Sequence, residues 1–245
     1  MLYLIGLGLN EKGISLEGLE ALKKFKEKDK IYLESYTVDF PYSIGKINKI
    51  LNKEIIKLKR EDVESEKLIK ESKNKNIGLL IYGSPLSATT HLSLINDCVK
   101  QGIKYKIIHS ASVFDAIAES GLQPYKFGRT TSIPEWQEKE NYKPESFIDV
   151  VKENEKINAH TLLLVNPGLS FEKALMQLET AARGKIKIDK IIVCSQLGTD
   201  NKKIVYDNIN NLKKLASRIK HPFCIIIPGK LHFVEEEVLK RLEKA

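Results

Sequence analysis

IGLLIYGSPLSATTH, residues 77–91, is the stretch that indicates the fold of this chain. Residues 77–82 form an apolar run that predicts a buried strand, and the run HLSLI from His91 onward predicts the start of a helix. The turn between them holds Gly83, Pro85 and four hydroxyl side chains. Open α/β sheets bind ligands at such strand ends, where hydroxyls and helix-start amides offer hydrogen bonds and glycine permits close approach. The pattern is equally typical of an ordinary connection in which Thr90 caps the helix.

The segments around this stretch predict a parallel sheet covered by helices. Short apolar runs alternate with helical patterns through residues 1–110, which is typical of a β-α-β chain. We expect strands at residues 2–7, 30–34, 54–58, 77–82 and 104–108, each apolar on both faces. We expect helices at residues 15–25, 42–51, 61–72 and 90–100.

The second half of the chain has a different pattern. A predicted helix at residues 112–119 ends at Gly121, and a long polar segment, residues 123–144, contains the only tryptophan, Trp136. A structureless stretch of this length is often functional. Further helices are expected at residues 145–156, 171–182, 208–219 and 231–242, and strands at residues 161–165, 190–195, 202–206 and 223–227. The hairpin-like residues 198–201 favour a mixed sheet, so we predict two α/β domains, residues 1–110 and 111–245, with a ligand cleft between them.

Composition narrows the class of protein. The 245 residues are 42% hydrophobic, which is enough for a well-buried core. The net charge of +8 suggests nucleic-acid binding, but Lys and Glu alternate along the surface segments and no nucleic-acid motif is present. The apolar runs are too short to span a bilayer, and the first residues lack the features of a signal peptide. The three cysteines lie far apart, without metal-binding spacing. We expect a soluble cytoplasmic protein that binds no metal, membrane or nucleic acid.

The glycines of the first loop do not form a dinucleotide-binding fingerprint. Gly6 and Gly8 give G-x-G after the first strand, but Glu11 stands where the third glycine would be. We expect the two glycines to let the backbone approach an uncharged or cationic group. Small or turn residues also follow the strands near residues 109–113, 165–168, 195–199 and 228–232. No hydrolase, zinc or phosphate-binding motif accompanies them, which favours a reaction that depends mainly on positioning.

Seven motifs, in order, resemble the diphthine synthase family of the tetrapyrrole-methylase superfamily. They are LYLIGLGL (2–9), REDVE (60–64), PLSATTH (85–91), YKFG (125–128), DVVKEN (149–154), HTLL (160–163) and PGKLH (228–232). The resemblance covers essentially the whole chain, and ATTH and PGKLH are its most specific parts.

The resemblance implies two α/β domains with S-adenosylmethionine in the cleft between them, and a homodimer. It implies successive methylation of the amino group of a 3-carboxy-3-aminopropyl-histidine on translation elongation factor 2, a step in making diphthamide, with S-adenosylhomocysteine as the second product. The cofactor contacts of the family map to Leu9, Ser84, Ser87, Ser112, Val113, Val165, Leu197 and Phe223.

The chain departs from the family pattern at two positions. Ser84 stands where the family usually has aspartate, and Asn166 stands where it often has aspartate. Both changes remove a negative charge near the cationic sulfonium, although Ser and Asn still accept hydrogen bonds.

Several roles remain open at the sequence level. His91 is a candidate general base for the acceptor amine, or else a helix-start histidine that bonds the loop. Lys126, Arg129 and Lys230 are candidate partners for the substrate carboxylate. Alternative functions are a porphyrin, corrin or RNA methyltransferase, or a non-catalytic homologue that binds the cofactor or elongation factor. The positive charge would steer an acidic partner protein.

Overall fold

The computed structural model describes residues 1–137 and 140–243. The chain divides into two compact units, Met1–Phe114 and Asp115–Ala245. Each unit is built around one five-stranded sheet. No helix in the described ranges is long and apolar enough to cross a membrane.

The first unit holds a parallel sheet in the order β3-β2-β4-β1-β5. The strands are β1 (Leu2–Gly6), β2 (Lys30–Glu34), β3 (Ile56–Leu58), β4 (Ile77–Ile81) and β5 (Tyr105–Ile108). The helices are α1 (Leu16–Lys23), α2 (Ile44–Leu51), α3 (Arg60–Glu64), α4 (Lys67–Ser72) and α5 (Leu92–Lys100). The sequence prediction of a parallel N-terminal sheet is therefore confirmed.

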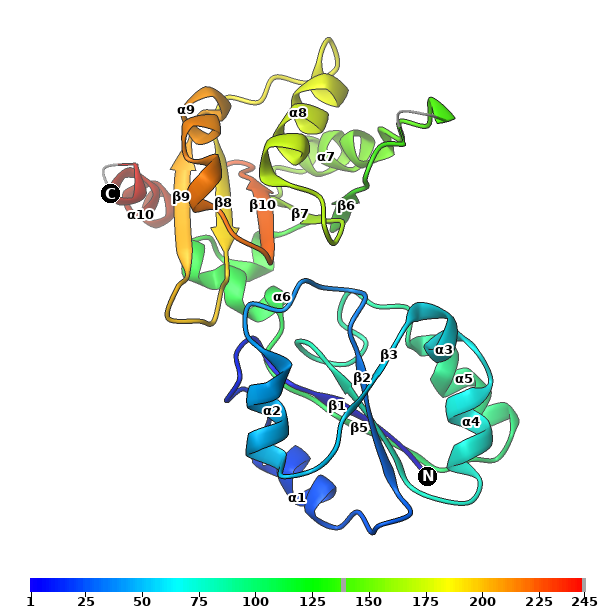
Figure 1. The fold of residues 1–245 in the computed structure, drawn as a ribbon. Helices are drawn as coiled ribbons and strands as arrows, with labels where there is room; N and C mark the ends of the chain where they lie inside the picture. Colours follow the sequence, from blue (N-terminus) through cyan, green and yellow to red (C-terminus); the bar gives the residue numbers. More distant parts are fainter. Residues whose placement is uncertain (138–139, 244–245) are drawn as a thin grey trace. The chain divides into compact units, whose positions relative to one another are not determined.

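Helices cover the two faces of this sheet (Figure 1), and one apolar cluster lies on each face. Leu22 of α1 and Ile47 of α2 pack with Ile5 and Leu80 on one face. Residues of α3, α4 and α5 pack on the other face, where Leu94 of α5 contacts the cluster that contains Leu79. All five residues of β4 are buried because the strand lies inside the sheet with helices on both sides.

Two details of the first unit differ from the sequence prediction. The edge strands β3 and β5 are not apolar on both faces, because Lys57 and Lys106 are exposed there, as is common for edge strands. The helix expected at residues 61–72 is two helices, since Ser65 is extended and its hydroxyl donates to the Asp62 carbonyl (2.8 Å). Such local side-chain bonds compete with helix continuation.

The second unit holds a mixed sheet in the order β6-β7-β10-β8-β9. The prediction of a mixed C-terminal sheet is confirmed. Its strands are β6 (Thr131–Ile133), β7 (Thr161–Val165), β8 (Ile191–Ser195), β9 (Lys203–Asp207) and β10 (Phe223–Ile227). Its helices are α6 (Val113–Ala116), which begins at the end of the first unit, α7 (Ser146–Lys156), α8 (Phe171–Ala182), α9 (Ile209–Lys214) and α10 (Phe233–Leu242), with 3-10 turns η1 (Ile117–Ser120), η2 (Pro124–Lys126) and η4 (Ala216–Arg218).

Helices α7, α8 and α9 lie beside this sheet (Figure 1). They contribute to one apolar cluster that packs against it. The expectation that residues 123–144 are structureless is wrong in part, because this segment contains η2 and β6. Trp136 is nearly buried and its indole N–H donates to the Pro144 carbonyl (3.2 Å). Residues 138–139 of that segment lie outside the described residues.

Candidate functional site

The carboxyl ends of β1 and β4 form the switch point of the first sheet. The two strands are neighbours, but the chain leaves β1 toward α1 on one face and leaves β4 toward α5 on the other. The two connections therefore diverge, and open α/β sheets bind ligands at such a point. The segment that the sequence analysis started from, residues 82–91, is one of the two connections.

The first-loop glycines serve close backbone packing. Gly8 and Gly83 exchange two backbone hydrogen bonds, both 3.0 Å long. A Cβ on Gly6 would lie 2.7 Å from the Gly83 carbonyl oxygen, and one on Gly8 would lie 2.8 Å from Gly13. These contacts give the two glycines a packing role, and the expectation that their backbone approaches an uncharged or cationic group stays a prediction. The more open position is Gly83, where φ is +74° and the atoms nearest to a Cβ lie 3.8 Å away, in Ala111 and Ser112.

Five of the predicted cofactor residues lie at this end of the first sheet. Leu9, Ser84 and Ser112 are buried, while Ser87 and Val113 are half-buried. The Leu9 carbonyl accepts a hydrogen bond from the Tyr82 hydroxyl (3.1 Å). The Ser84 hydroxyl lies 3.2 Å from Nδ1 of His109, an exposed residue that follows β5. We call these five residues the first-unit group.

The other three predicted cofactor residues lie at one end of the second sheet, where β7 and β8 end and β10 begins. The antiparallel register pairs Cys224 with Leu164, so Phe223 lies opposite Val165 at the end of β7. Phe223 also pairs with Ser195 at the end of β8, two residues before Leu197. We call Val165, Leu197 and Phe223 the second-unit group.

Hydrogen bonds from a side chain and from the backbone hold the loops at this end of the second sheet. The Ser195 hydroxyl donates to the Lys220 carbonyl (2.7 Å), and the Gln196 amide donates to the Pro222 carbonyl (2.8 Å). The Phe223 ring packs edge-on against Phe171, with centroids 5.4 Å apart. The loop that carries Leu197 is thereby fastened to the start of β10.

Backbone strain falls in the same two segments. Six residues other than glycine have positive φ among the described residues, and three of these are asparagines, which tolerate that conformation. The other three are Leu86 (φ 69°), Ala88 (φ 55°) and Gln196 (φ 51°). Residues held in this region tend to cluster at functional sites. The strain thus points to the two segments that carry Ser84, Ser87 and Leu197, independently of the sequence motifs.

Each of the two groups, taken by itself, has a chemistry that suits an uncharged or cationic ligand. They offer three hydroxyls, backbone groups and apolar side chains, and no Lys or Arg stands among them. Where the structure describes the chain, no set of three or more His, Cys, Asp or Glu residues is placed to hold a metal ion. Of the two family departures, Ser84 is buried beside His109, and Asn166 is exposed directly after β7.

The structure speaks against one of the two roles considered for His91 and leaves the general-base role a prediction. It directly precedes α5, it is 1% exposed, and its side chain makes no capping bond. Neither ring nitrogen has a hydrogen-bond partner in the described part of the chain, so the idea that it bonds the loop is wrong. Burial lowers the pKa of His91, opposed by the charges of Glu34 and Glu64.

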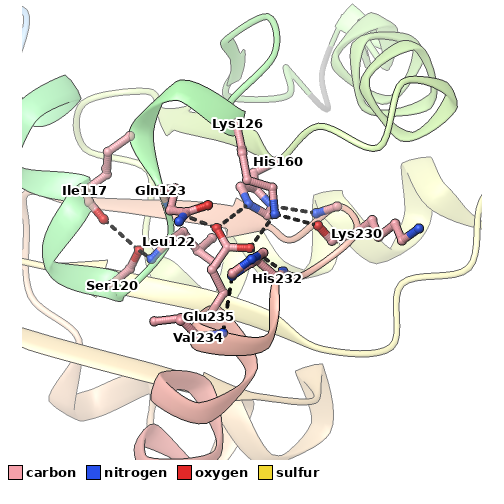
Figure 2. Close-up of polar contacts among 11 residues, drawn as sticks. Ile117, Ser120, Leu122, Gln123, Lys126, His160, Lys230, His232, Val234 and Glu235 are labelled. Atoms are coloured by element: carbon pink, nitrogen blue, oxygen red, sulfur yellow. Dashed lines mark hydrogen bonds and ion pairs between the residues drawn. The ribbon is translucent and has the colours of Figure 1, made fainter.

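A buried polar cluster in the second unit joins three of the family motifs (Figure 2). The Glu235 carboxylate, on α10, accepts from the amides of Gln123 (2.9 Å) and His232 (2.7 Å), from the Lys126 ammonium and from His160. Nδ1 of His160 accepts from the Gly229 amide (2.8 Å), so the proton of the neutral ring resides on Nε2 and points to Glu235. We call Glu235, Lys126 and His160 the Glu235 network.

This network changes the interpretation of the basic residues. The Lys126 ammonium is already bound by Glu235 and by the Lys230 carbonyl (2.8 Å), and Arg129 pairs with Glu153. Burial alone would raise the pKa of Glu235, but the hydrogen bonds that it accepts lower it to about 2. Sequence analysis missed Glu235 because it stands in the run Glu235-Glu236-Glu237, which is typical of a solvated helix face.

The amino-acid sequence is similar to known proteins over most of its length. Residues 1–213 match the family model described as Tetrapyrrole (Corrin/Porphyrin) Methylases. The chain is 42% identical over 263 residues to the diphthine synthase of Methanococcus aeolicus, covering 99% of this chain and 98% of that protein. It is 40% identical over 188 residues to the diphthine methyl ester synthase of Schizosaccharomyces pombe, covering 76% of this chain and 63% of that protein.

The fold is similar to that of solved structures. A crystal structure of a diphthine synthase superposes with a TM-score of 0.89 at 30% identity, covering 100% of this chain and 96% of that one.

Proposed function

The chain belongs to the tetrapyrrole methylase family and, within it, to the diphthine synthases, and we propose that it methylates a modified histidine of translation elongation factor 2. Membership makes it an S-adenosylmethionine-dependent methyltransferase of diphthamide biosynthesis. The proposed acceptor is the amino group of a 3-carboxy-3-aminopropyl-histidine, methylated in successive steps by a cytoplasmic homodimer. The observation that carries the proposal is the 42% identity over nearly the full length of both chains.

We propose that both residue groups bind S-adenosylmethionine, which supplies the methyl group and leaves as neutral S-adenosylhomocysteine. The uncharged lining of the groups supports this, because a sulfonium would be repelled by Lys or Arg. The switch-point position of the first-unit group and the strain at Leu86, Ala88 and Gln196 support it independently.

The residues of the chain then act mainly by alignment. Methyl transfer is an in-line displacement with a leaving group that is already activated, so holding donor and acceptor in line supplies most of the catalysis. The hydrogen bonds from Ser195 to Lys220 and from Gln196 to Pro222, and the paired Gly8 and Gly83, provide rigid supports for that alignment. The acceptor amine must be neutral to react, and an alkyl amine is mostly protonated at neutral pH.

Replacing Ser84 with Asp tests whether the carboxylate that the family usually carries at this position strengthens cofactor binding. We expect Ser84→Asp to raise the affinity for S-adenosylmethionine by about tenfold, because a buried negative charge would attract the sulfonium. Affinity for S-adenosylhomocysteine, which lacks that charge, should change little. Titration calorimetry with both ligands measures the effect, and Ser84→Asn is the matched uncharged control. An equal change for both ligands would show that charge at this position does not act on the sulfonium.

A methyl-transfer assay with several acceptors tests the proposed function. The protein is incubated with methyl-labelled S-adenosylmethionine and one of four acceptors: elongation factor 2 with the aminocarboxypropyl group, the same factor without it, a tetrapyrrole, or RNA. We expect label only in the first. Label in the tetrapyrrole or RNA would favour the alternative methyltransferases, and cofactor binding without label would favour a non-catalytic homologue.

A second product is favoured by the similarity to the diphthine methyl ester synthase. Such an enzyme would also methylate a carboxylate, giving an ester. Mild alkali hydrolyses methyl esters and leaves N-methyl groups in place. Loss of one methyl group from the product after alkali treatment would support ester formation, and an alkali-stable product would restrict the reaction to nitrogen.

A further inference from the structure

A polar cluster with unpartnered atoms lies at the carboxyl ends of β2 and β4. It comprises Glu34 at the end of β2, Tyr36 in the following loop, and Thr89 and His91 before α5; we call it the His91 cluster. In the described ranges, the hydroxyls of Tyr36 and Thr89 and both ring nitrogens of His91 are buried and find no hydrogen-bond partner. Buried polar groups nearly always have one, so such a group in a native fold needs an explanation.

Burial and nearby carboxylates act in opposite directions on the charge of His91. Glu34 is 1% exposed, and its carboxylate accepts from the amides of Tyr36 (2.7 Å) and Thr37 (2.9 Å). Glu64 of α3 also acts on the ring, and the Arg60 guanidinium lies over the Tyr36 ring, 5.2 Å from its centroid. Burial lowers the pKa of His91, which keeps the ring neutral at pH 7, while the two carboxylates would stabilise it once charged.

Successive methylation requires proton removal between rounds. In each transfer the amine nitrogen forms a bond to the methyl carbon, the carbon–sulfur bond breaks with its electron pair left on sulfur, and the positive charge passes to nitrogen. The first and second products still carry N–H protons, and the amine must lose one before its lone pair can react again. A neutral imidazole with both nitrogens free can take a proton at one and release it at the other.

We propose that His91 accepts the proton that the substrate amine loses between successive methyl transfers, with Glu34 and Glu64 balancing the charge of the imidazolium. The proposal rests on the proposed function and assigns the proton step of that same reaction. It is supported by the position of His91 on the connection that carries Ser84 and Ser87, and by the two unpartnered nitrogens of a buried ring.

The test compares His91→Ala with Thr90→Ala, an exposed position one residue away. Mass spectrometry follows the mono-, di- and trimethylated forms of elongation factor 2 over time. We expect His91→Ala to slow the second and later transfers by about 100-fold, so that the monomethyl form accumulates. The amine of the first round can lose its proton to water before it binds, whereas the bound methylated ammonium depends on a positioned base, which typically contributes this much or more. Added imidazole should restore the later transfers in His91→Ala and have no effect on Thr90→Ala.

Further measurements separate a proton role from a folding defect. Both variants should bind S-adenosylmethionine as the wild type does, and if His91→Ala does not fold, His91→Gln replaces it, since its amide cannot accept a proton near neutral pH. An NMR titration of the ligand-free protein should show a lower His91 pKa in Glu34→Gln than in wild type. An inactive wild type would refute the proposed function, whereas an active wild type with an equally active His91→Ala would overturn this inference alone. An unchanged or raised His91 pKa in Glu34→Gln would also overturn it.

Discussion

Replacing Glu235 with Gln is expected to lower the free energy of unfolding at pH 7 by about 3 kcal/mol. The lowering of the pKa of Glu235 from 4.5 to about 2 corresponds to a stabilisation of this order. A glutamine would also leave the Lys126 ammonium without its buried counter-charge. Denaturant unfolding measures the change, and Glu236→Gln is the matched control, because that neighbouring side chain is exposed and outside the network.

The pH dependence of this effect has a definite sign. A carboxylate whose pKa is lowered in the folded state contributes stability above its unfolded pKa and loses it as the pH falls. The gap between wild type and Glu235→Gln should therefore be full above pH 4.5 and shrink as the pH approaches about 2. A gap that stays constant across this range, or an equal loss in Glu236→Gln, would contradict the assigned role of the network.

Replacing Gly6 with Ala is expected to weaken S-adenosylmethionine binding by at least about tenfold, or 1.4 kcal/mol. The added methyl group would lie 2.7 Å from the Gly83 carbonyl oxygen and 2.9 Å from Cβ of Ser110. Overpacking of this kind typically costs about 1–3 kcal/mol and moves the backbone. The loops that would move carry Ser84 and Ser112, both proposed to contact the cofactor.

Calorimetric titration of Gly6→Ala checks this effect, with Gly45→Ala as the control. Gly45 is exposed in α2, and its added Cβ would meet only the Ser43 hydroxyl, at 3.4 Å. We expect Gly45→Ala to bind the cofactor normally and to be slightly stabilised, since Ala is a better helix former than Gly. Unchanged cofactor affinity in Gly6→Ala would show that the loops after β4 and β5 do not form the binding site.

Most helices and strands were predictable from the sequence, because the spacing of apolar residues and the turn-forming residues between them determine these elements. The limits of β2, β7 and β10 match the predicted ones, since each strand has an apolar centre and is followed by polar or turn residues. The strand β6 was missed, because only Ile133 of its three residues is apolar. The break between α3 and α4 was also missed, since it depends on where the Ser65 hydroxyl points.

The candidate site was predictable only in part. The strand ends and the family motifs pointed to Ser84, Leu197 and their neighbours, although whether these residues contact the cofactor stays a prediction. The strained backbone at Leu86 and Gln196 is set by tertiary contacts and leaves no mark in composition or period. The partners of Lys126 lie 104 and 109 residues away in the chain, so no local pattern could show that its charge is already paired.

The most direct test of the central claim is the mass of elongation factor 2 after incubation with this protein and S-adenosylmethionine, with the modified position located by peptide fragmentation. The factor must carry the 3-carboxy-3-aminopropyl group beforehand. We predict a gain in whole methyl increments, all on that modified histidine and only when S-adenosylmethionine is present. No gain, or methyl groups on any other residue, would contradict the proposed function.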